Sequence, residues 1–102
     1  MTKEKTTTIK IFDYAGKFAE NKDKAQHIRE KLTRPNLEKG NSIIYDYSGV
    51  DSTTQSFTHA LISDHIRNFG KEVLDRLYFK NCSETVKKII ELVTEYMQRK
   101  IK

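Results

Sequence analysis

Apolar and polar positions along this chain of 102 residues repeat with two different periods. Residues 6–12 are rich in β-branched side chains, and Ile9 and Ile11 stand two positions apart, which predicts a strand. Residues 15–32 repeat with a helical period, and lysine, glutamate and arginine occupy the opposite side of this predicted helix. Its apolar positions are Ala15, Phe18, Ala19, Ala25, Ile28 and Leu32. Pro35 is expected to end the segment, because proline cannot continue a helix and biases the residue before it toward extended geometry.

The middle of the chain combines a short apolar run with a second helical pattern. The run Ile43–Tyr47 predicts a central strand that is covered on both sides. The helical pattern that follows ends at Gly70, a residue type that commonly terminates helices. Its apolar positions are Phe57, Leu61, Ile62, Ile66 and Phe69.

The last third repeats the alternation of strand and helix. Leu77 and Phe79 stand on the same side of a predicted strand, and Asn81 is expected to cap the helix that follows. The apolar stripe of that helix consists of Val86, Ile89, Ile90, Val93, Met97 and Ile101. Its end runs past the length that a small sheet can cover, so a homodimer through this end and a frayed, solvated end are both open alternatives.

This order of elements predicts a fold of the α/β class. We expect strands near 6–12, 42–48 and 74–80, and helices near 16–33, 56–69 and 83–100. A β-α-β-α-β-α order implies a small mixed or parallel sheet with helices packed on it, a sandwich in one domain that spans residues 1–102. The residues expected to be mostly buried are Phe57, Leu61, Ile66, Leu77, Ile89, Ile90 and Val93.

Composition narrows the class of protein. The net charge is +5, from 19 basic and 14 acidic side chains, and the positive excess lies in the two ends. No apolar run approaches the roughly 20 residues that span a bilayer. The single cysteine, Cys82, excludes an internal disulfide and fits a reducing compartment, so we expect a cytoplasmic domain. Cys82 stands near a helix start, where a lowered pKa is one alternative, but we favour a small buried residue.

The stretch Ile43–Gly70 carries a family resemblance. An apolar run ends in Asp-Tyr-Ser-Gly-Val, crosses a loop of small hydroxylated residues and enters an amphipathic helix at Ser56. This order resembles the central strand–loop–helix of the STAS domain, the module of anti-anti-sigma factors. Together with residues 20–36 and 74–98, it is most similar to the STAS-like family of uncharacterised function. The resemblance implies a STAS-like fold, a phosphoacceptor at Ser56, and partners that include histidine-kinase-like ATPases.

The chain also departs from the classical STAS pattern. Where classical domains have Asp-Ser-Ser-Gly, this sequence has Thr54, Gln55, Ser56 and Phe57. The acid is lost, the bulky Phe57 is expected to anchor the helix in the core, and the last classical strand and helix are expected to be absent. Ser56 therefore has two interpretations, a helix N-cap or a phosphorylated switch, and we favour the cap alone. Thr53 and Thr54 compete with it for both roles.

Residues 48–59 form the predicted partner-binding surface. Their hydroxyl groups are expected to crowd one strand-to-helix junction, outside the end of a central strand, where open α/β sheets tend to bind ligands. The candidate residues are Ser48, Gly49, Asp51, Ser52, Thr53, Thr54, Ser56, Thr58 and His59. Gly49 allows the chain to turn there without a side-chain clash.

Catalytic and metal-binding patterns are weak. Ser56 and His59 lie three positions apart on one predicted helix, yet no third group orients the imidazole. His59 and His65 point to different helical faces, so with one cysteine no metal-ligand spacing exists, and no cofactor is expected. The STAS resemblance implies a regulatory module that binds a protein partner, and given these weak patterns we predict that the module is non-catalytic. A basic accessory protein associated with nucleic acid is the less favoured alternative.

Overall fold

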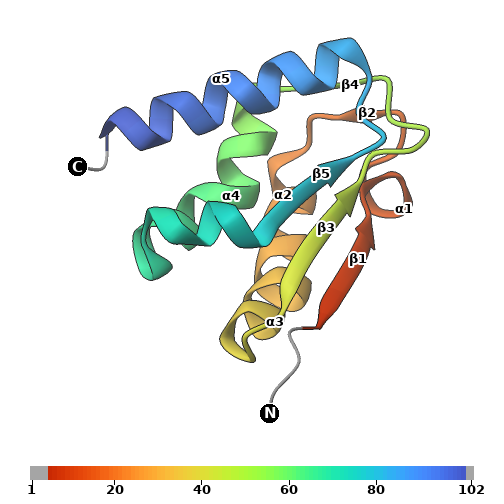
Figure 1. Cartoon of the computed structure of the whole chain (residues 1–102). Helices are drawn as coiled ribbons and strands as arrows, with labels where there is room; N and C mark the ends of the chain where they lie inside the picture. Colours follow the sequence, from red (N-terminus) through yellow and green to blue (C-terminus); the bar gives the residue numbers. More distant parts are fainter. Residues whose placement is uncertain (1–4, 101–102) are drawn as a thin grey trace.

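The computed structural model describes residues 5–100. Three strands form the main sheet: β1 (Thr6–Lys10), β3 (Ser42–Asp46) and β5 (Leu77–Lys80). All are parallel, in the order β1-β3-β5, so the middle strand of the sequence is also the central strand of the sheet (Figure 1). The predicted α/β class and the alternating element order are confirmed.

The first predicted helix is wrong at its beginning. The strand ends at Lys10, and residues 11–19 form the short helix α1 (Ile11–Ala15) and the two-residue strand β2 (Phe18–Ala19). Gly16, with φ +75°, ends α1 in a conformation that favours glycine. β2 then pairs in parallel with β4 (Ser52–Thr53). This second sheet lies against the beginning of the last helix (Figure 1).

Pro35 lies inside a helical rod and does not end it. The rod consists of α2 (Lys22–Ile28), the π-helical turn η1 (Arg29–Thr33) and α3 (Arg34–Glu38). In the π turn, the Arg34 N–H donates to the carbonyl of Arg29, five residues earlier. Because the hydrogen-bond pattern restarts here, Pro35 occupies the first turn of α3, where a missing N–H is tolerated.

The second half follows the prediction more closely. α4 (Gln55–Phe69) ends at Gly70, whose N–H donates to the carbonyl of Ile66. The strand expected from residue 74 begins only at Leu77, because the 3₁₀ turn η2 (Lys71–Arg76) precedes it. Arg76 holds this turn by donating to the carbonyls of Leu37 and Asn41, each at 2.8 Å.

The last helix, α5 (Glu84–Lys100), is capped by Ser83 and not by Asn81. Ser83 Oγ accepts from the Val86 N–H at 3.2 Å. Asn81 has a left-handed φ of +59° and reaches back to β3. Within residues 5–100, no helix is both long and apolar enough to cross a membrane.

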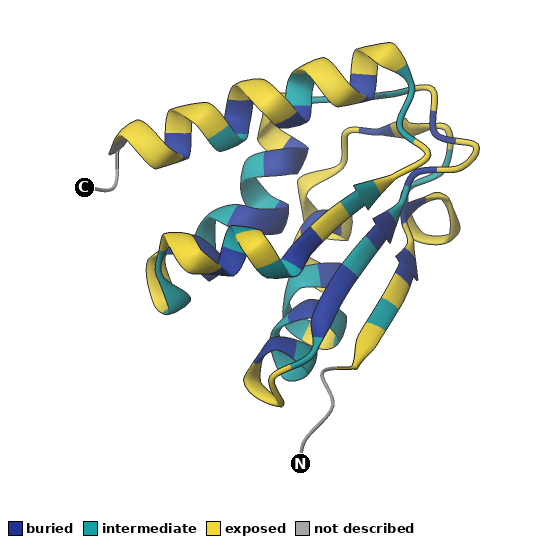
Figure 2. Cartoon of the chain, viewed as in Figure 1, coloured by how far each residue is buried: buried dark blue, intermediate teal, exposed yellow. Residues whose placement is uncertain are grey.

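The core lies on one face of the main sheet. Ile43 and Tyr45 of β3 are fully buried toward the helices, whereas Ile44 and Asp46 on the other face are only half-buried. Figure 2 shows α2 and α3 behind the sheet, α4 and α5 to its left and above it, and no helix in front of it. The expectation that β3 is covered on both sides is therefore wrong for the part of the chain that the structure describes.

Most of the predicted core residues are buried. They are Phe57, Leu61, Ile66, Leu77, Ile90 and Val93, and Ile89 is half-buried. Met97, with 6% of its surface exposed, packs within the chain, so it does not form the predicted uncovered end of the α5 stripe. Ile101 lies outside the described residues, and the homodimer stays a prediction.

Candidate functional site

The carboxyl end of β3 is organised by Asp46. Its Oδ1 accepts three hydrogen bonds: from the Ser48 N–H at 2.9 Å, from Ser48 Oγ at 2.7 Å, and from Asn81 Nδ2 at 3.0 Å. The bond from Asn81 and the two from Ser48 favour the charged form and lower the pKa of the Asp46 carboxyl to about 2. Asp46 thus ties the loop after β3 to the loop after β5, and the Ser48 hydroxyl is used in that tie.

Gly49 completes the turn after Asp46. Its φ is +84°, and a Cβ placed there would lie 3.0 Å from Cδ2 of Phe12. The Val50 N–H donates to the Tyr47 carbonyl across the turn at 3.0 Å. Glycine is therefore needed both for its backbone conformation and for the close approach of the Phe12 ring, as the sequence suggested in part.

The loop continues along the second sheet. The Asp51 N–H donates to the Lys17 carbonyl at 2.8 Å, and the Asp51 carbonyl accepts from Ser83 Oγ at 2.9 Å. Thr53 is buried, and its hydroxyl donates to the Ala19 carbonyl at 2.7 Å. These bonds fix the loop to β2 on one side and to the start of α5 on the other, while the Asp51 side chain stays exposed.

Thr54 caps α4, and Ser56 does not. Thr54 Oγ1 accepts from the Phe57 N–H at 3.1 Å, and the Thr54 carbonyl accepts from Thr58 Oγ1 at 3.0 Å. Ser56 is the second residue of the helix, and its side chain is exposed. Within residues 5–100, its hydroxyl has no hydrogen-bond partner. The cap interpretation of Ser56 is therefore wrong, and its competitor Thr54 takes the role.

The predicted cluster of available hydroxyls is mostly used internally. The four that make hydrogen bonds within the chain are Ser48, Thr53, Thr54 and Thr58. Among the candidates that the structure describes, only Ser52 and Ser56 retain hydroxyls without such a bond, and Ser52 is half-buried. Ser56 is thus the exposed residue of the junction whose hydroxyl makes no hydrogen bond to a described residue.

His59 lines a groove between α4 and α5, which we call the α4–α5 groove. Its lining residues are Gln55, His59, Leu92, Val93 and Tyr96, and its volume is about 450 Å³. The His59 and Tyr96 rings meet edge-on with centroids 5.8 Å apart. The sequence interpretation missed Leu92 and Tyr96, although two apolar side chains four positions apart on the polar side of a helix are a signal for such a patch.

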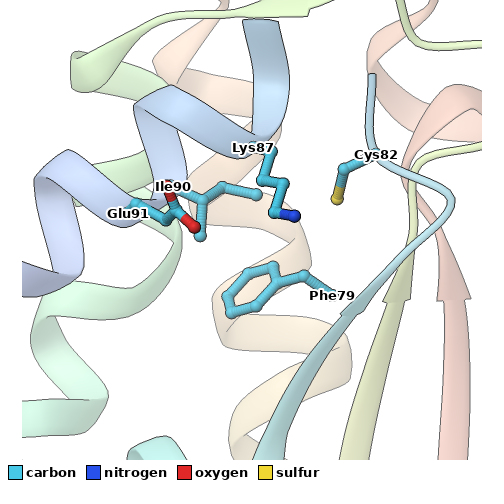
Figure 3. A pocket seen from close by; sticks show the side chains of 5 residues that line it. All are labelled: Phe79, Cys82, Lys87, Ile90 and Glu91. Carbon is cyan, nitrogen blue, oxygen red and sulfur yellow. The ribbon is translucent and has the colours of Figure 1, made fainter. Parts of the chain in front are cut away.

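A second hollow lies between β5 and α5. Figure 3 shows its lining side chains converging from the strand, the turn and the helix: Phe79, Cys82, Lys87, Ile90 and Glu91, around a volume of about 370 Å³. Burial raises the pKa of the Cys82 thiol, so the alternative of a lowered pKa is wrong. Cys82 is half-buried and unsuited to nucleophilic work at neutral pH.

The described residues contain no group of three or more histidine, cysteine, aspartate or glutamate side chains that could hold a metal ion.

A scan against protein families matches residues 24–87, more than half of the chain, to the STAS-like domain of unknown function (DUF4325). The chain belongs to this STAS-like family. The matched part of the STAS-like domain extends from α2 to the first turn of α5, so it contains Asp46, Thr54 and Ser56. Neither the curated proteins nor the solved structures contain a match.

Proposed function

We propose that this STAS-like domain is a non-catalytic regulatory module that binds a protein partner through the α4–α5 groove and is switched by phosphorylation of Ser56. The observation that carries the proposal is the exposed Ser56 hydroxyl, which makes no hydrogen bond to residues 5–100, in the first turn of a fifteen-residue helix. Since Thr54 supplies the cap, Ser56 has no structural task that a phosphate would disturb.

The first turn of α4 is suited to a phosphate. The N–H groups of a helix's first turn lack intrahelical acceptors, and the helix dipole favours negative charge there. A phosphoserine adds about two negative charges and three acceptor oxygens. Phosphorylation of Ser56 therefore changes the charge of the surface without disturbing the cap.

The groove beside Ser56 has the composition of a protein interface. Leu92 and Tyr96 are 50% and 49% exposed, and large apolar or aromatic side chains of this kind act as anchors in interfaces. His59, on the groove wall, follows Ser56 by three positions, a spacing that places both residues on neighbouring parts of one helix face. A phosphate on Ser56 is then near enough to alter how a partner engages the groove.

The resemblance to classical STAS domains points to a histidine-kinase-like ATPase as the partner. In this chain the classical acid is replaced by Thr54, and Phe57 is fully buried. The exposed side chains that a kinase meets in this turn are therefore Gln55 and Ser56. A kinase for this domain must recognise them without the classical acid.

The test uses a purified histidine-kinase-like ATPase from the same organism. Titration calorimetry gives the dissociation constant for the wild type, Leu92→Ala and Tyr96→Ala, and we expect each groove variant to bind at least about fivefold more weakly, equal to about 1 kcal/mol. Tyr78→Ala is the matched control, because Tyr78 is exposed to 51% but lies on β5, on the face of the main sheet that points away from the helices. Equal weakening by Tyr78→Ala and Tyr96→Ala, or no effect of either groove variant, contradicts the proposed surface.

A further inference from the structure

The face of the main sheet that points away from the helices is a second unoccupied surface. The register places Thr8, Ile44 and Tyr78 side by side across the three strands, and Lys10, Asp46 and Lys80 in the next row on the same face. The outer positions of both rows are exposed, and Ile44 and Asp46 are half-buried. No described helix crosses this face (Figure 2). We call it the open sheet face.

An uncovered face is unusual for a parallel sheet. All-parallel sheets are normally covered on both faces, because their crossover helices pack on both sides. Here the rod α2–α3 and the helix α4 lie on the same side of the sheet (Figure 1). The open sheet face therefore departs from the usual architecture of all-parallel sheets, which are covered on both faces.

The side chains on this face suit a polyanion with exposed bases. Tyr78 is 51% exposed in an edge strand and presents a ring beside Ile44. Lys10 and Lys80 lie two strand spacings apart, about 10 Å. Lys80 lies one row, about 7 Å, from Tyr78 in the same strand, and Lys10 lies about 12 Å from Tyr78 across the sheet. Asp46 between them carries a negative charge, but its Oδ1 is engaged by Ser48 and Asn81.

Charge complementarity favours nucleic acid over a protein at this face. The row of lysines keeps a net positive charge, and the whole chain carries +5. Lysine is depleted from the cores of protein interfaces, whereas lysine and threonine are common contacts to phosphate and sugar. Leu92 and Tyr96, two exposed side chains of an interface type, lie elsewhere, in the α4–α5 groove.

We infer that the open sheet face binds single-stranded nucleic acid, with a base stacked on Tyr78 and phosphates paired with Lys10 and Lys80. Stacking on an aromatic side chain is available only where bases are unpaired, so single strands bind in preference to duplexes. The site is independent of Ser56 and of the groove. It places the polyanion on the sheet and not on the basic ends of the chain.

Fluorescence anisotropy of labelled oligouridine and oligothymidine of about 12 nucleotides, at about 50 mM salt, tests this site. Tyr78→Ala is expected to weaken binding at least about fivefold, while Tyr78→Phe, which keeps a stacking ring, stays within about twofold of wild type. The double variant Lys10→Gln, Lys80→Gln is expected to reduce the salt slope of log K by about 1.4, since each phosphate contact to a single strand contributes about 0.7.

Lys87→Gln, Lys88→Gln is the matched control, because it removes the same charge from two exposed lysines on α5. If this control weakens binding as much as the Lys10 and Lys80 variant, the attraction is general and the site is wrong. Absence of binding by the wild type, or equal binding of duplex, also overturns it. Sedimentation in which wild type is dimeric and Tyr78→Ala monomeric assigns the face to a second copy instead. Since the substituted side chains are exposed or half-exposed, circular dichroism is expected to show all variants folded.

Discussion

Two serines in one strand-to-helix connection have opposite roles. Ser48 follows β3, and both its N–H and its hydroxyl donate to Asp46 at 2.9 and 2.7 Å. Ser56, eight positions later, lies exposed in the first turn of α4 with no hydrogen bond from its hydroxyl among the described residues. The same side chain is part of the framework in one place and available for chemistry in the other. The difference lies in the neighbours: Asp46 offers an acceptor to Ser48, whereas Thr54 already supplies the helix cap beside Ser56.

The histidines of α4 repeat this contrast. His59 is half-buried at the groove and meets Tyr96. His65, six positions later, is fully buried, and neither of its ring nitrogens has a hydrogen-bond partner among the described residues. The start of α4 thus presents polar side chains to solvent. Further along the helix, the polar imidazole of His65 is buried without a hydrogen-bond partner among the described residues. The comparison predicts where a substitution affects stability and where it affects only binding.

The largest expected effect comes from the residue that anchors the first turn of α4. Phe57 is fully buried directly after Ser56. Phe57→Ala is expected to destabilise the fold by about 3–5 kcal/mol, because it removes apolar burial and leaves a cavity. Urea unfolding followed by circular dichroism measures this change. A loss below about 1 kcal/mol would mean that the first turn is not held by the core.

The buried His65 predicts a pH dependence of stability. Burial, followed by the Arg29 and Arg34 cations, lowers the pKa of His65 to about 4, while the nearby Asp64 and Glu30 carboxylates act in the opposite direction. In the unfolded chain, the His65 imidazole binds a proton near its ordinary pKa of 6.5. Stability from the neutral imidazole is therefore present above pH 6.5 and lost as the pH falls from 6.5 toward 4.

Thermal unfolding between these pH values tests the assignment. His65→Leu has no ionisable group and is expected to be less sensitive to pH in this window than wild type, and more stable at its acidic end. His59→Gln is the matched control on the same helix, and it should retain the wild-type pH dependence. If His59→Gln removes the dependence and His65→Leu keeps it, the assignment to His65 is wrong.

A smaller effect on the free energy of unfolding is expected from substitutions at the cap, Thr54, and at the exposed Ser56. Thr54→Ala is expected to cost about 1 kcal/mol, since it leaves the Phe57 N–H without its acceptor. Ser56→Ala is expected to change stability by less than about 0.5 kcal/mol, because the Ser56 hydroxyl makes no hydrogen bond to any described residue. The two variants remove the same kind of group, so their chemical denaturation curves compare directly. The reverse order of effects would restore Ser56 as the cap.

The periodicity of the sequence predicted the larger elements because their apolar positions have one unambiguous period. The strand β3, the helix α4 and its end at Gly70 were predicted on that basis. Residues 11–19 were not, because five- and two-residue elements are too short to show a period, and Phe18 is exposed at 56% although it fits the predicted helical face. Pro35 misled the prediction because the π turn before it restarts the hydrogen-bond pattern, and the apolar period of the sequence does not show such a restart.

The candidate site was predicted in its location and not in its detail. Sequence order alone places three hydroxyls, those of Thr53, Thr54 and Ser56, near the helix start. Which one caps depends on backbone geometry: Thr54 is extended, with φ −113° and ψ 162°, and Ser56 is already helical. The open sheet face was missed for a similar reason, because β3 is apolar enough to suit coverage on both sides, and the placement of the helices decides otherwise.

The most direct test of the account is the affinity of the domain with and without one phosphate on Ser56. The domain carrying phosphoserine at position 56, made by genetic incorporation, is compared with the unmodified domain in binding to the proposed histidine-kinase-like ATPase and in thermal unfolding. The account predicts a change in dissociation constant of at least about tenfold, equal to about 1.4 kcal/mol. The melting temperature should change little, since a helix N-terminus accommodates a phosphate. Equal dissociation constants for the two forms, with the wild type bound, would contradict the switch at Ser56.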